Sequence, residues 1–328
     1  MRIALTGSIA TDHLMTYKGR FADSLVVDQL DKIALSFLVE DLEIHRGGVA
    51  ANIAFGMANL GQRSILVGAA GGDFADYRSW LERHGVDCDS VRISETRHTA
   101  RFVCTTDNQM AQIATFYAGA MSEAREIELG PVANRVGGLD LVVVSSNDPE
   151  AMLRHTQECR TRNIPFAADP SQQLAFMDGE SIRALIDGAT YLLTNEYEAA
   201  LTEQKTGWSS DEIAERVQTR VITKGKNGAL IATRGEAPIE VAVANEVRKA
   251  DPTGVGDAFR AGFFTGLAWG FGHERSAQVG SMLATYVVET VGTQEYELGR
   301  RRFLERFTQS YGEQAGTEIA PHLSCPRP

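Results

Sequence analysis

Short apolar runs alternate with amphipathic stretches along most of this chain. The short runs have the length of buried strands, and they cover residues 2–7, 64–68, 139–145, 165–168, 190–194 and 220–224, with further strands expected around 228–233 and 239–244. The longer stretches are expected to be helices, and they cover residues 49–60, 73–84, 149–163, 178–187, 196–205, 209–218 and 273–290. This alternation predicts a mainly parallel sheet with both faces covered by helices, and ligands at the carboxyl ends of its strands.

Two segments interrupt this alternation. Residues 14–45 mix apolar and charged residues, and residues 96–118 alternate in polarity like two adjoining strands. We therefore expect a small β-sheet lid formed by residues 14–45 and 96–118, beside an α/β core formed by residues 1–13, 46–95 and 119–328. Asp12 and His13 are expected in a loop after the first strand. A sheet built from two excursions has exposed edges and faces, so we expect it to make a homodimer contact.

Charge and composition narrow the range of partners. The 328 residues carry a formal net charge of −11, which argues against a nucleic-acid surface and favours a small-molecule ligand. The four cysteines are far apart in the sequence, at 88, 104, 159 and 325, and we expect reduced, buried thiols. The first residues lack the apolar segment of a signal peptide, and no apolar run approaches membrane-spanning length. These features predict a cytoplasmic protein without membrane contact.

The stretch from residue 250 to 270 contains the most informative pattern. A turn at 251–254 leads into Gly256-Asp257 and then into an apolar helix with small residues on one side. Gly254 and Gly256 leave backbone N–H groups uncovered at a helix start, which favours an anion. Asp257 is then either an N-terminal cap or a general base beside the anion, and the cap is the commoner role. The chain has no P-loop pattern, and Phe259 replaces the third glycine of a dinucleotide fingerprint.

Other polar residues directly follow predicted strands or open the helices after them. They are Ser8, Asp12, Gly48, Asn52, Gln172, Gln173, Asn195 and Glu198. Each alone is typical of a turn or a helix cap. Because the carboxyl ends of parallel strands lie on one edge of a sheet, we expect these side chains to gather there.

The heptapeptide Asp-Pro-Thr-Gly-Val-Gly-Asp at 251–257 resembles the signature of the ribokinase-like (PfkB) carbohydrate and nucleoside kinases. Further matching stretches lie at 6–14, 45–54, 168–173 and 194–198, and within this family the chain is most similar to the actinobacterial adenosine kinases. The resemblance implies a three-layer α/β/α core with a small β-sheet lid. It also implies transfer of the ATP γ-phosphate to the 5′-hydroxyl of adenosine, giving AMP in purine salvage. A kinase of another nucleoside or a free sugar stays an alternative, as does a non-catalytic binding protein.

The resemblance also implies roles for individual residues. Asp257 would take the hydroxyl proton, while the N–H groups of Gly254, Val255 and Gly256 would face the phosphoryl oxygens. On the substrate side, Asp12 and Asn52 would hold the ribose hydroxyls, and Phe102 and Phe116 would sandwich the purine. Further nucleoside contacts are expected from Ser8, Ser36, Gly48, Gln172 and Gln173.

For ATP, the resemblance implies a binding strip along the loop after the strand at 220–224. Its residues are Asn195, Thr223, Lys224, Gly225, Lys226, Asn227, Gly228 and Gly256. Glu198 would reach Mg²⁺ through water. Many members of the family also bind a monovalent cation such as K⁺ beside the signature loop, and the sequence leaves that requirement open. Pro252 and Val255 depart from the usual Thr and Ala of the signature. We expect no loss of activity, because the N–H that proline lacks precedes the anion site.

Overall fold

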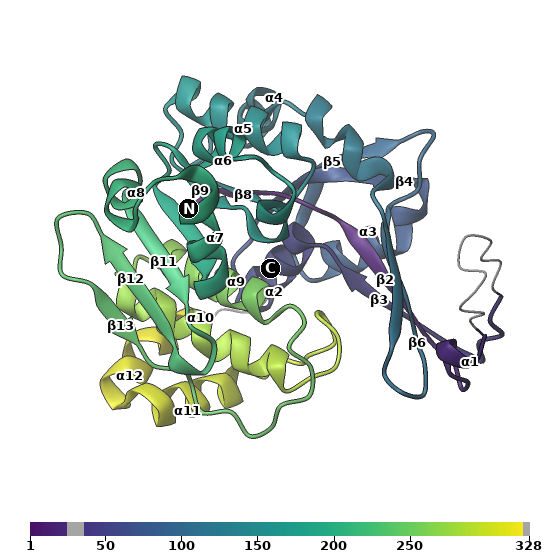
Figure 1. Ribbon diagram of the computed structural model, residues 1–328. Helices are drawn as coiled ribbons and strands as arrows, with labels where there is room; N and C mark the ends of the chain where they lie inside the picture. The colour runs from purple at the N-terminus through teal and green to yellow at the C-terminus, as the bar shows by residue number, and fades with distance from the viewer. Residues whose placement is uncertain (25–35, 324–328) are drawn as a thin grey trace.

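The computed structural model describes residues 1–24 and 36–323. Its centre is a nine-stranded sheet in the order β13-β12-β11-β10-β9-β8-β1-β4-β5 (Figure 1). The strands are β1 (Ile3–Thr6), β4 (Ile65–Gly71), β5 (Asp87–Ser94), β8 (Leu141–Ser145), β9 (Phe166–Asp169), β10 (Tyr191–Asn195), β11 (Thr219–Thr223), β12 (Ala229–Thr233) and β13 (Ile239–Val241). The seven strands β11, β10, β9, β8, β1, β4 and β5 pair in parallel. Strand β12 pairs antiparallel with both β11 and β13.

Helices cover both faces of this sheet. One layer contains α2 (Val49–Asn59), α3 (Ala75–Arg83), α9 (Val255–Ala268), α10 (His273–Val288), α11 (Arg300–Tyr311) and α12 (Glu313–Leu323). The other contains α4 (Leu129–Val136), α5 (Pro149–Arg162), α6 (Gly179–Ile186), α7 (Glu196–Thr206) and α8 (Ser210–Arg216). In β1, Ile3 and Leu5 pack into the first core and Ala4 into the second. The three-layer α/β/α prediction is confirmed.

A second sheet has the strand order β3-β2-β6-β7 and extends from one side of the body (Figure 1). Its strands are β2 (Ala10–Thr16), β3 (Asp41–Gly47), β6 (Ala100–Thr106) and β7 (Gln112–Tyr117). Asp12 and His13 lie within β2, so their predicted loop position is wrong. Most of β2 is only half-buried, so the strand lacks the apolar run that marks buried strands such as β1 and β8. The short helix α1 (Phe21–Ser24) follows β2, and residues 25–35 of the expected lid lie outside the described residues.

Small residues bring α9 close to its neighbours, as its sequence predicts. A Cβ atom on Gly262 would lie 2.6 Å from the Cα of Gly280 in α10. A Cβ atom on Gly56 of α2 would lie 2.6 Å from the Cβ of Ala261. Close packing therefore holds α9 near α2 and α10, and this fixes the position of the α9 N-terminus.

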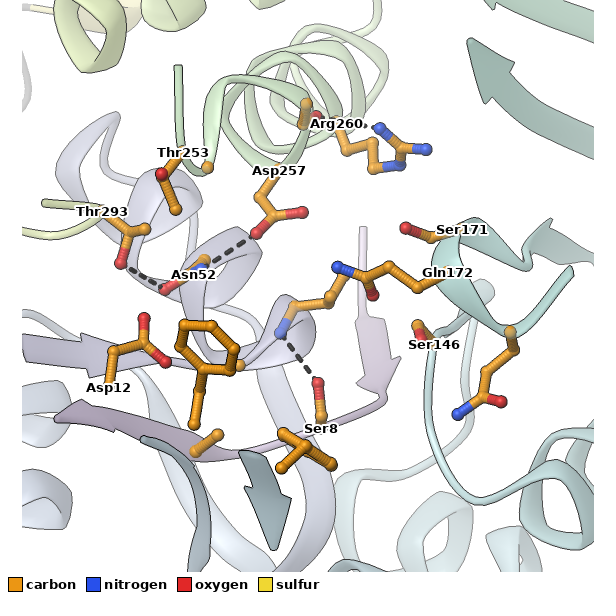
Figure 2. Close-up of a pocket in the computed structure, with 18 of the residues that line it drawn as sticks. Ser8, Asp12, Asn52, Ser146, Ser171, Gln172, Thr253, Asp257, Arg260 and Thr293 are labelled. Carbon is orange, nitrogen blue, oxygen red and sulfur yellow. Dashed lines mark hydrogen bonds between the residues drawn. The ribbon is translucent and has the colours of Figure 1, made fainter. Parts of the chain in front are cut away.

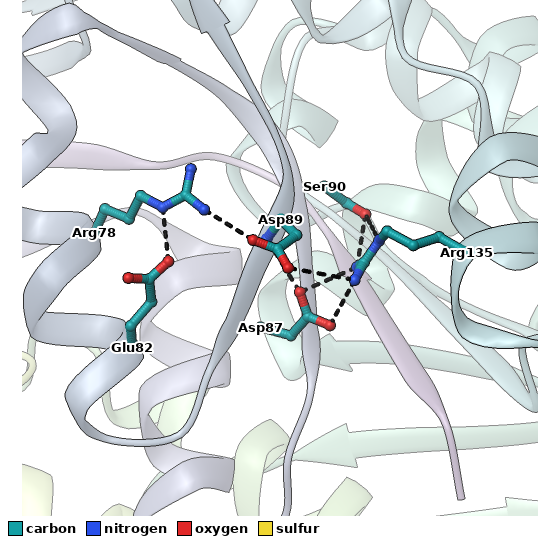
Figure 3. A network of polar contacts seen from close by, with 6 residues as sticks. All are labelled: Arg78, Glu82, Asp87, Asp89, Ser90 and Arg135. Atoms are coloured by element: carbon teal, nitrogen blue, oxygen red, sulfur yellow. Dashed lines mark hydrogen bonds and ion pairs between the residues drawn. The ribbon is translucent and has the colours of Figure 1, made fainter.

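The edge strand β5, which the sequence pattern did not reveal, is tied to the helices by ion pairs (Figure 3). Arg135 of α4 donates to both oxygens of the buried Asp87 at 3.0 Å and also to Ser90. Arg78 of α3 bridges Asp89 at 2.9 Å. The polar composition of β5 thus serves its attachment to α3 and α4.

Cys88, Cys104 and Cys159 are buried and unpaired, and Cys325 lies outside the described residues. None of the helices within residues 1–24 and 36–323 is both long and apolar enough to cross a membrane.

Candidate active site

A cavity of about 610 Å³ lies between the carboxyl ends of the large sheet and the inner face of the small sheet (Figure 2). Its walls come from residues at or after β1, β8, β9, β10 and β11, from β2, β6 and β7, and from the N-terminal ends of α2 and α9. The expected gathering of polar residues at this edge is therefore observed. Of the nucleoside-side residues, the cavity is lined by Ser8, Asp12, Gly48, Asn52, Phe102, Phe116, Gln172, Gln173 and Asp257.

A second cavity of about 600 Å³ lies along the other side of the α9 N-terminus. It is bordered by the loop after β11, the segment 243–249 and one side of α10. Thr223 and Gly256 line both cavities. Two ligands bound in the two cavities would therefore meet at Gly256, at the start of α9.

One row of the small sheet faces the first cavity. Strand pairing places His45 opposite Asp12, Asp12 opposite Phe102, and Phe102 opposite Phe116. Directly opposed residues point to the same face of a sheet. The row therefore presents a carboxyl group and two half-exposed aromatic rings to the same ligand volume.

The start of α9 has the geometry of an anion site. Gly254 precedes the helix with φ 75°, a left-handed conformation that glycine adopts without strain. The Val255 N–H reaches the Pro252 carbonyl oxygen at 3.4 Å. In the described part of the chain, no hydrogen bond is recorded for the N–H groups of Gly254, Gly256 and Asp257. These free donors and the positive helix end favour a phosphate or a developing oxyanion.

The side chain of Asp257 does not cap its own helix, so that interpretation is wrong. Instead, its Oδ2 atom accepts a hydrogen bond of 2.9 Å from Nδ2 of Asn52 in α2 (Figure 2). Burial raises the pKa of Asp257 to about 6, while Asn52 and Arg260 oppose that rise. A carboxyl group with this pKa is ionised at neutral pH and still basic enough to accept a proton.

Arg260 and Asp169 form a buried ion pair next to this carboxylate. Their atoms Nη2 and Oδ1 are 2.6 Å apart, and Arg260 Nη1 also donates to the Gly256 carbonyl at 3.1 Å. Together with Glu198, these groups place one positive and two negative charges around Asp257. Sequence analysis missed Arg260, although a cation within an apolar helix was a usable signal.

Asp12 is the second carboxyl group of the cavity with an elevated pKa. Burial raises its pKa to about 6, opposed by His45 and assisted by Glu295 and Asp251. His45 lies between two carboxylates, with Nε2 3.1 Å from Glu43 and Nδ1 3.4 Å from Glu295. Their hydrogen bonds and charges raise the pKa of His45, against its partial burial.

Asn195 and Glu198 form a reciprocal cap at the start of α7. The Asn195 N–H donates to Glu198 Oε2, and the Glu198 N–H donates to Asn195 Oδ1, each at 2.8 Å. Both side chains line the first cavity, and burial raises the pKa of Glu198. In the described part of the chain, no three His, Cys, Asp or Glu side chains gather as they would around a metal ion.

The residues expected along ATP divide between the two cavities. Thr223, Gly225, Lys226, Gly228 and Gly256 line the second cavity, and Val255 lines it too. Lys224 and Asn227 line neither, and Lys224 pairs with Glu240 at 3.1 Å. Ser36 is exposed and lines neither cavity.

Several residues that sequence analysis missed also border the first cavity. They are Ala10, Val49, Met121, Ser146, Ser171, Phe176, Thr253, Arg260 and Thr293. Thr293 comes from the loop after α10, and its hydroxyl lies 3.0 Å from Asn52 Oδ1. No periodicity or motif marks that loop, so its place in the site depends on tertiary structure alone.

Comparisons with known proteins identify the family. The family model described as pfkB family carbohydrate kinase matches residues 10–298, which is most of the chain. The chain belongs to the pfkB family of carbohydrate kinases. These enzymes transfer a phosphoryl group from ATP to a hydroxyl group, and the expected family and fold are thereby confirmed.

Two relatives within the pfkB family are nucleoside kinases. The chain is similar to the nucleoside kinase of Methanocaldococcus jannaschii, with 28% identity over 89% of this chain and 92% of that protein. The nucleoside kinase of Burkholderia thailandensis, solved with inosine, superimposes with a TM-score of 0.83. It is 34% identical, and the match covers 95% of this chain and 99% of that one. A complex of the same enzyme with ADP-inosine superimposes with a TM-score of 0.80.

Proposed function

We propose that this pfkB-family enzyme is an adenosine kinase, which transfers the γ-phosphate of ATP to the 5′-hydroxyl of adenosine and forms AMP for purine salvage. The observation that carries this proposal is the row of Asp12, Phe102 and Phe116, which faces Asp257 across one cavity. A carboxylate can accept hydrogen bonds from two ribose hydroxyls, and two aromatic rings can stack on a base. This combination suits a nucleoside better than a free sugar.

The proposed reaction takes place at the start of α9. Asp257 removes the proton of the 5′-hydroxyl as the oxygen attacks the γ-phosphorus, and the bond to the β-phosphate oxygen breaks to release ADP. The N–H groups of Gly254 and Gly256 lie where they can meet the charge on the transferred group. Donors of this kind contribute on the order of 3 kcal/mol each to lowering the barrier.

The second cavity is the proposed site for the ATP base and ribose. Val243, Ala284 and Val288 give it an apolar wall, and Lys226 and Lys249 supply positive charge at its border. We place Mg²⁺ at the junction with the first cavity, reached by Glu198 through water. Because Glu198 stands without a carboxylate cage among the described residues, ATP and water would supply most of the ligands.

A second candidate function is the phosphorylation of other purine nucleosides. The relative from Burkholderia thailandensis was solved with inosine, and the amide of Gln172 points into the cavity here (Figure 2). A carboxamide can rotate to present its N–H₂ group or its oxygen, so it suits both a 6-amino and a 6-oxo purine. Steady-state rates with adenosine, inosine, guanosine, ribose and fructose distinguish these functions. A higher kcat/KM for ribose or fructose than for adenosine would exclude the adenosine proposal.

The role of Asp257 is tested by Asp257→Asn, with Asp211→Asn on the exposed surface of α8 as the matched control. We expect turnover to fall by at least about a thousandfold, because a general base and an electrostatic partner are lost together. Adenosine should still bind in isothermal titration calorimetry. Turnover close to that of the control would remove Asp257 from the mechanism.

We also propose that the small sheet is a lid that closes over the nucleoside and joins two chains in a homodimer. Its inner row touches the first cavity, while its outer face carries the exposed side chains of Leu42, Ile44 and Ile113. Apolar side chains grouped on one sheet face favour coverage by another surface.

A further inference from the structure

A chain of buried hydrogen bonds runs from Asp257 to the aromatic residues of α3. Asn52 Nδ2 donates to Asp257, and Asn52 Oδ1 accepts from Gln294 Nε2 at 2.9 Å. The same Nε2 atom donates to the Tyr77 hydroxyl at 2.6 Å, and Gln294 Oε1 accepts from Trp80 Nε1 at 3.2 Å. Gln294 is 1% exposed and lines neither of the two large cavities.

The two ends of this chain determine how Gln294 is oriented. An indole N–H can only donate, so the group that Gln294 turns toward Trp80 must be its oxygen. Tyr77 donates its hydroxyl hydrogen to the Gly47 carbonyl at 2.9 Å, and a carbonyl can only accept. The Tyr77 oxygen is thereby left as an acceptor for the Gln294 N–H₂ group. Both neighbours thus require the same orientation of the Gln294 amide.

The orientation of Gln294 then determines that of Asn52. Because Gln294 offers an N–H to Asn52, the Asn52 oxygen must face Gln294 and its N–H₂ group must face Asp257. Thr293 supplies one more hydroxyl, but its single hydrogen is shared between Asn52 Oδ1 at 3.0 Å and the Arg46 carbonyl at 2.7 Å. An inverted Asn52 would instead point its oxygen at the Asp257 carboxylate.

We propose that Gln294, oriented by Trp80 and Tyr77, is a positioning residue that keeps the Asn52 amide donating to the catalytic carboxylate. This inference rests on the proposed role of Asp257 as the base. It assigns a function to Gln294 in the loop after α10, a residue that lies behind Asn52 and lines neither cavity. The loop contacts both α2 and α3, so it links the packing of these two helices to the protonation of Asp257.

The consequence is a defined effect on the pH dependence of kcat. The charged groups facing Asp257 are Arg260 on its own helix, Asp169 of β9 and Glu198 of α7. Arg260 and the Asn52 hydrogen bond favour the ionised form, and the two carboxylates oppose it. Losing the Asn52 donor removes one of the two favourable contributions, so the Asp257 carboxylate becomes easier to protonate.

The experiment compares Gln294→Met and Gln294→Glu with Gln278→Met, each assayed with saturating preferred substrate between pH 5 and 9. Gln278 is a matched control, because it is a buried glutamine on α10 whose side chain bonds only to Glu274 and Arg275 among the described residues. Methionine removes the N–H donor, and glutamate reverses the polarity by accepting from both Trp80 and Asn52. We expect the acidic limb of kcat to move up by about one pH unit, further for glutamate, with recovery of kcat at high pH.

Each result of this experiment either supports the positioning role of Gln294 or overturns it. The inference is overturned if the acidic limb of kcat lies at the same pH in both folded Gln294 variants as in wild type. A loss of kcat that high pH does not restore would also overturn it. If the Gln294 variants fail to fold, Trp80→Phe replaces them, since it removes the indole N–H while keeping an aromatic ring against Phe55, and it must move the limb in the same direction. An active Asp257→Asn enzyme would instead disprove the proposed base itself, which separates the two failures.

Discussion

Two carboxyl groups of the first cavity, Asp12 and Asp257, have pKa values raised to about 6 for the same physical reason. Both are removed from bulk water, and desolvation disfavours the charged form. Their surroundings differ in a useful way, because Asp257 has a donor in Asn52 and Asp12 has a neighbouring imidazole in His45. We therefore expect the acidic limb of kcat to report Asp257, and the acidic limb of kcat/KM to include Asp12 as well.

The raised pKa of Asp257 predicts that this residue lowers the free energy of unfolding at neutral pH. The folded state binds the Asp257 proton more tightly than the unfolded state, so the protein loses stability as pH rises from about 4 to about 6. Asp257→Asn removes this cost and should increase the free energy of unfolding at pH 7.5 by about 1–2 kcal/mol. At pH 5 the gain should be roughly half as large. Urea unfolding at both pH values measures it, and an equal gain at both would show that charge is not the cause.

At the residue scale, the sequence indicated the residue types of the site but not their pairings. The glycines around Asp257 predicted an anion site, and the helix start with free N–H groups agrees with it. The choice between cap and base was open, because it depends on whether a donor from another element reaches the carboxylate. Asn52 is that donor, 205 residues away, and no local pattern encodes the contact.

Among the elements, the four strands of the small sheet define the nucleoside side of the cavity by their register. A shift of one residue between β2 and β6 would turn Phe102 away from Asp12. The sequence suggested β6 and β7 through their alternation, but β2 was concealed by its half-exposed side chains. Because sheet register depends on tertiary pairing, the periodicity of the sequence could not predict which row of side chains faces the ligand.

This row predicts a selective effect of Phe102→Ala. Removing one stacking ring should weaken nucleoside binding by about 1–3 kcal/mol and raise the KM for the nucleoside roughly tenfold or more. The KM for ATP should change little, because Phe102 does not line the second cavity. Steady-state kinetics with each substrate varied in turn provides the measurement, and Val103→Ala in the same strand is the control. A larger change in the KM for ATP would place the base elsewhere.

The edge strand β5 predicts a purely structural effect. Arg135→Met leaves the buried Asp87 carboxylate without its two guanidinium hydrogen bonds. We expect a loss of about 1–3 kcal/mol in the free energy of unfolding, below the value for a fully buried pair because Arg135 is partly exposed. The kcat of the folded enzyme should equal that of wild type, since β5 lies at the far edge of the sheet. Chemical denaturation and active-site titration test both parts, and Arg92→Met is the exposed control on the same strand.

For the whole molecule, alternation of strands and helices was enough to predict the three-layer core, because buried parallel strands have a strong apolar pattern. One edge of the sheet was harder to predict than the other. The sequence indicated β12 and β13 at one edge, but strand β5 at the opposite edge is polar and was not predicted. Helices α11 and α12 follow the last motif, and the sequence did not show how they pack.

The proposed homodimer is a property of the outer face of the small sheet. On that face Leu42 lies in one row with Met15 and Ile113, and Ile44 lies beside them in the next row. Leu42 is 54% exposed and Ile44 is 58% exposed, so burying this face between two chains would remove apolar surface from water. Placing charge there should separate the chains, because two desolvated lysines would face each other across a symmetric interface.

The double variant Ile44→Lys/Ile113→Lys should therefore sediment as a monomer under conditions where wild type sediments as a dimer. Ile93→Lys on the edge strand β5 carries the same substitution on the large sheet and should leave the dimer intact. Analytical ultracentrifugation at several protein concentrations distinguishes the two states. If the small sheet acts as a lid only when it is supported by its partner, the monomer should also show a raised KM for the nucleoside with an unchanged KM for ATP. A double variant that stays dimeric would place the interface on another surface, and a monomeric wild type would remove the dimer from the proposal.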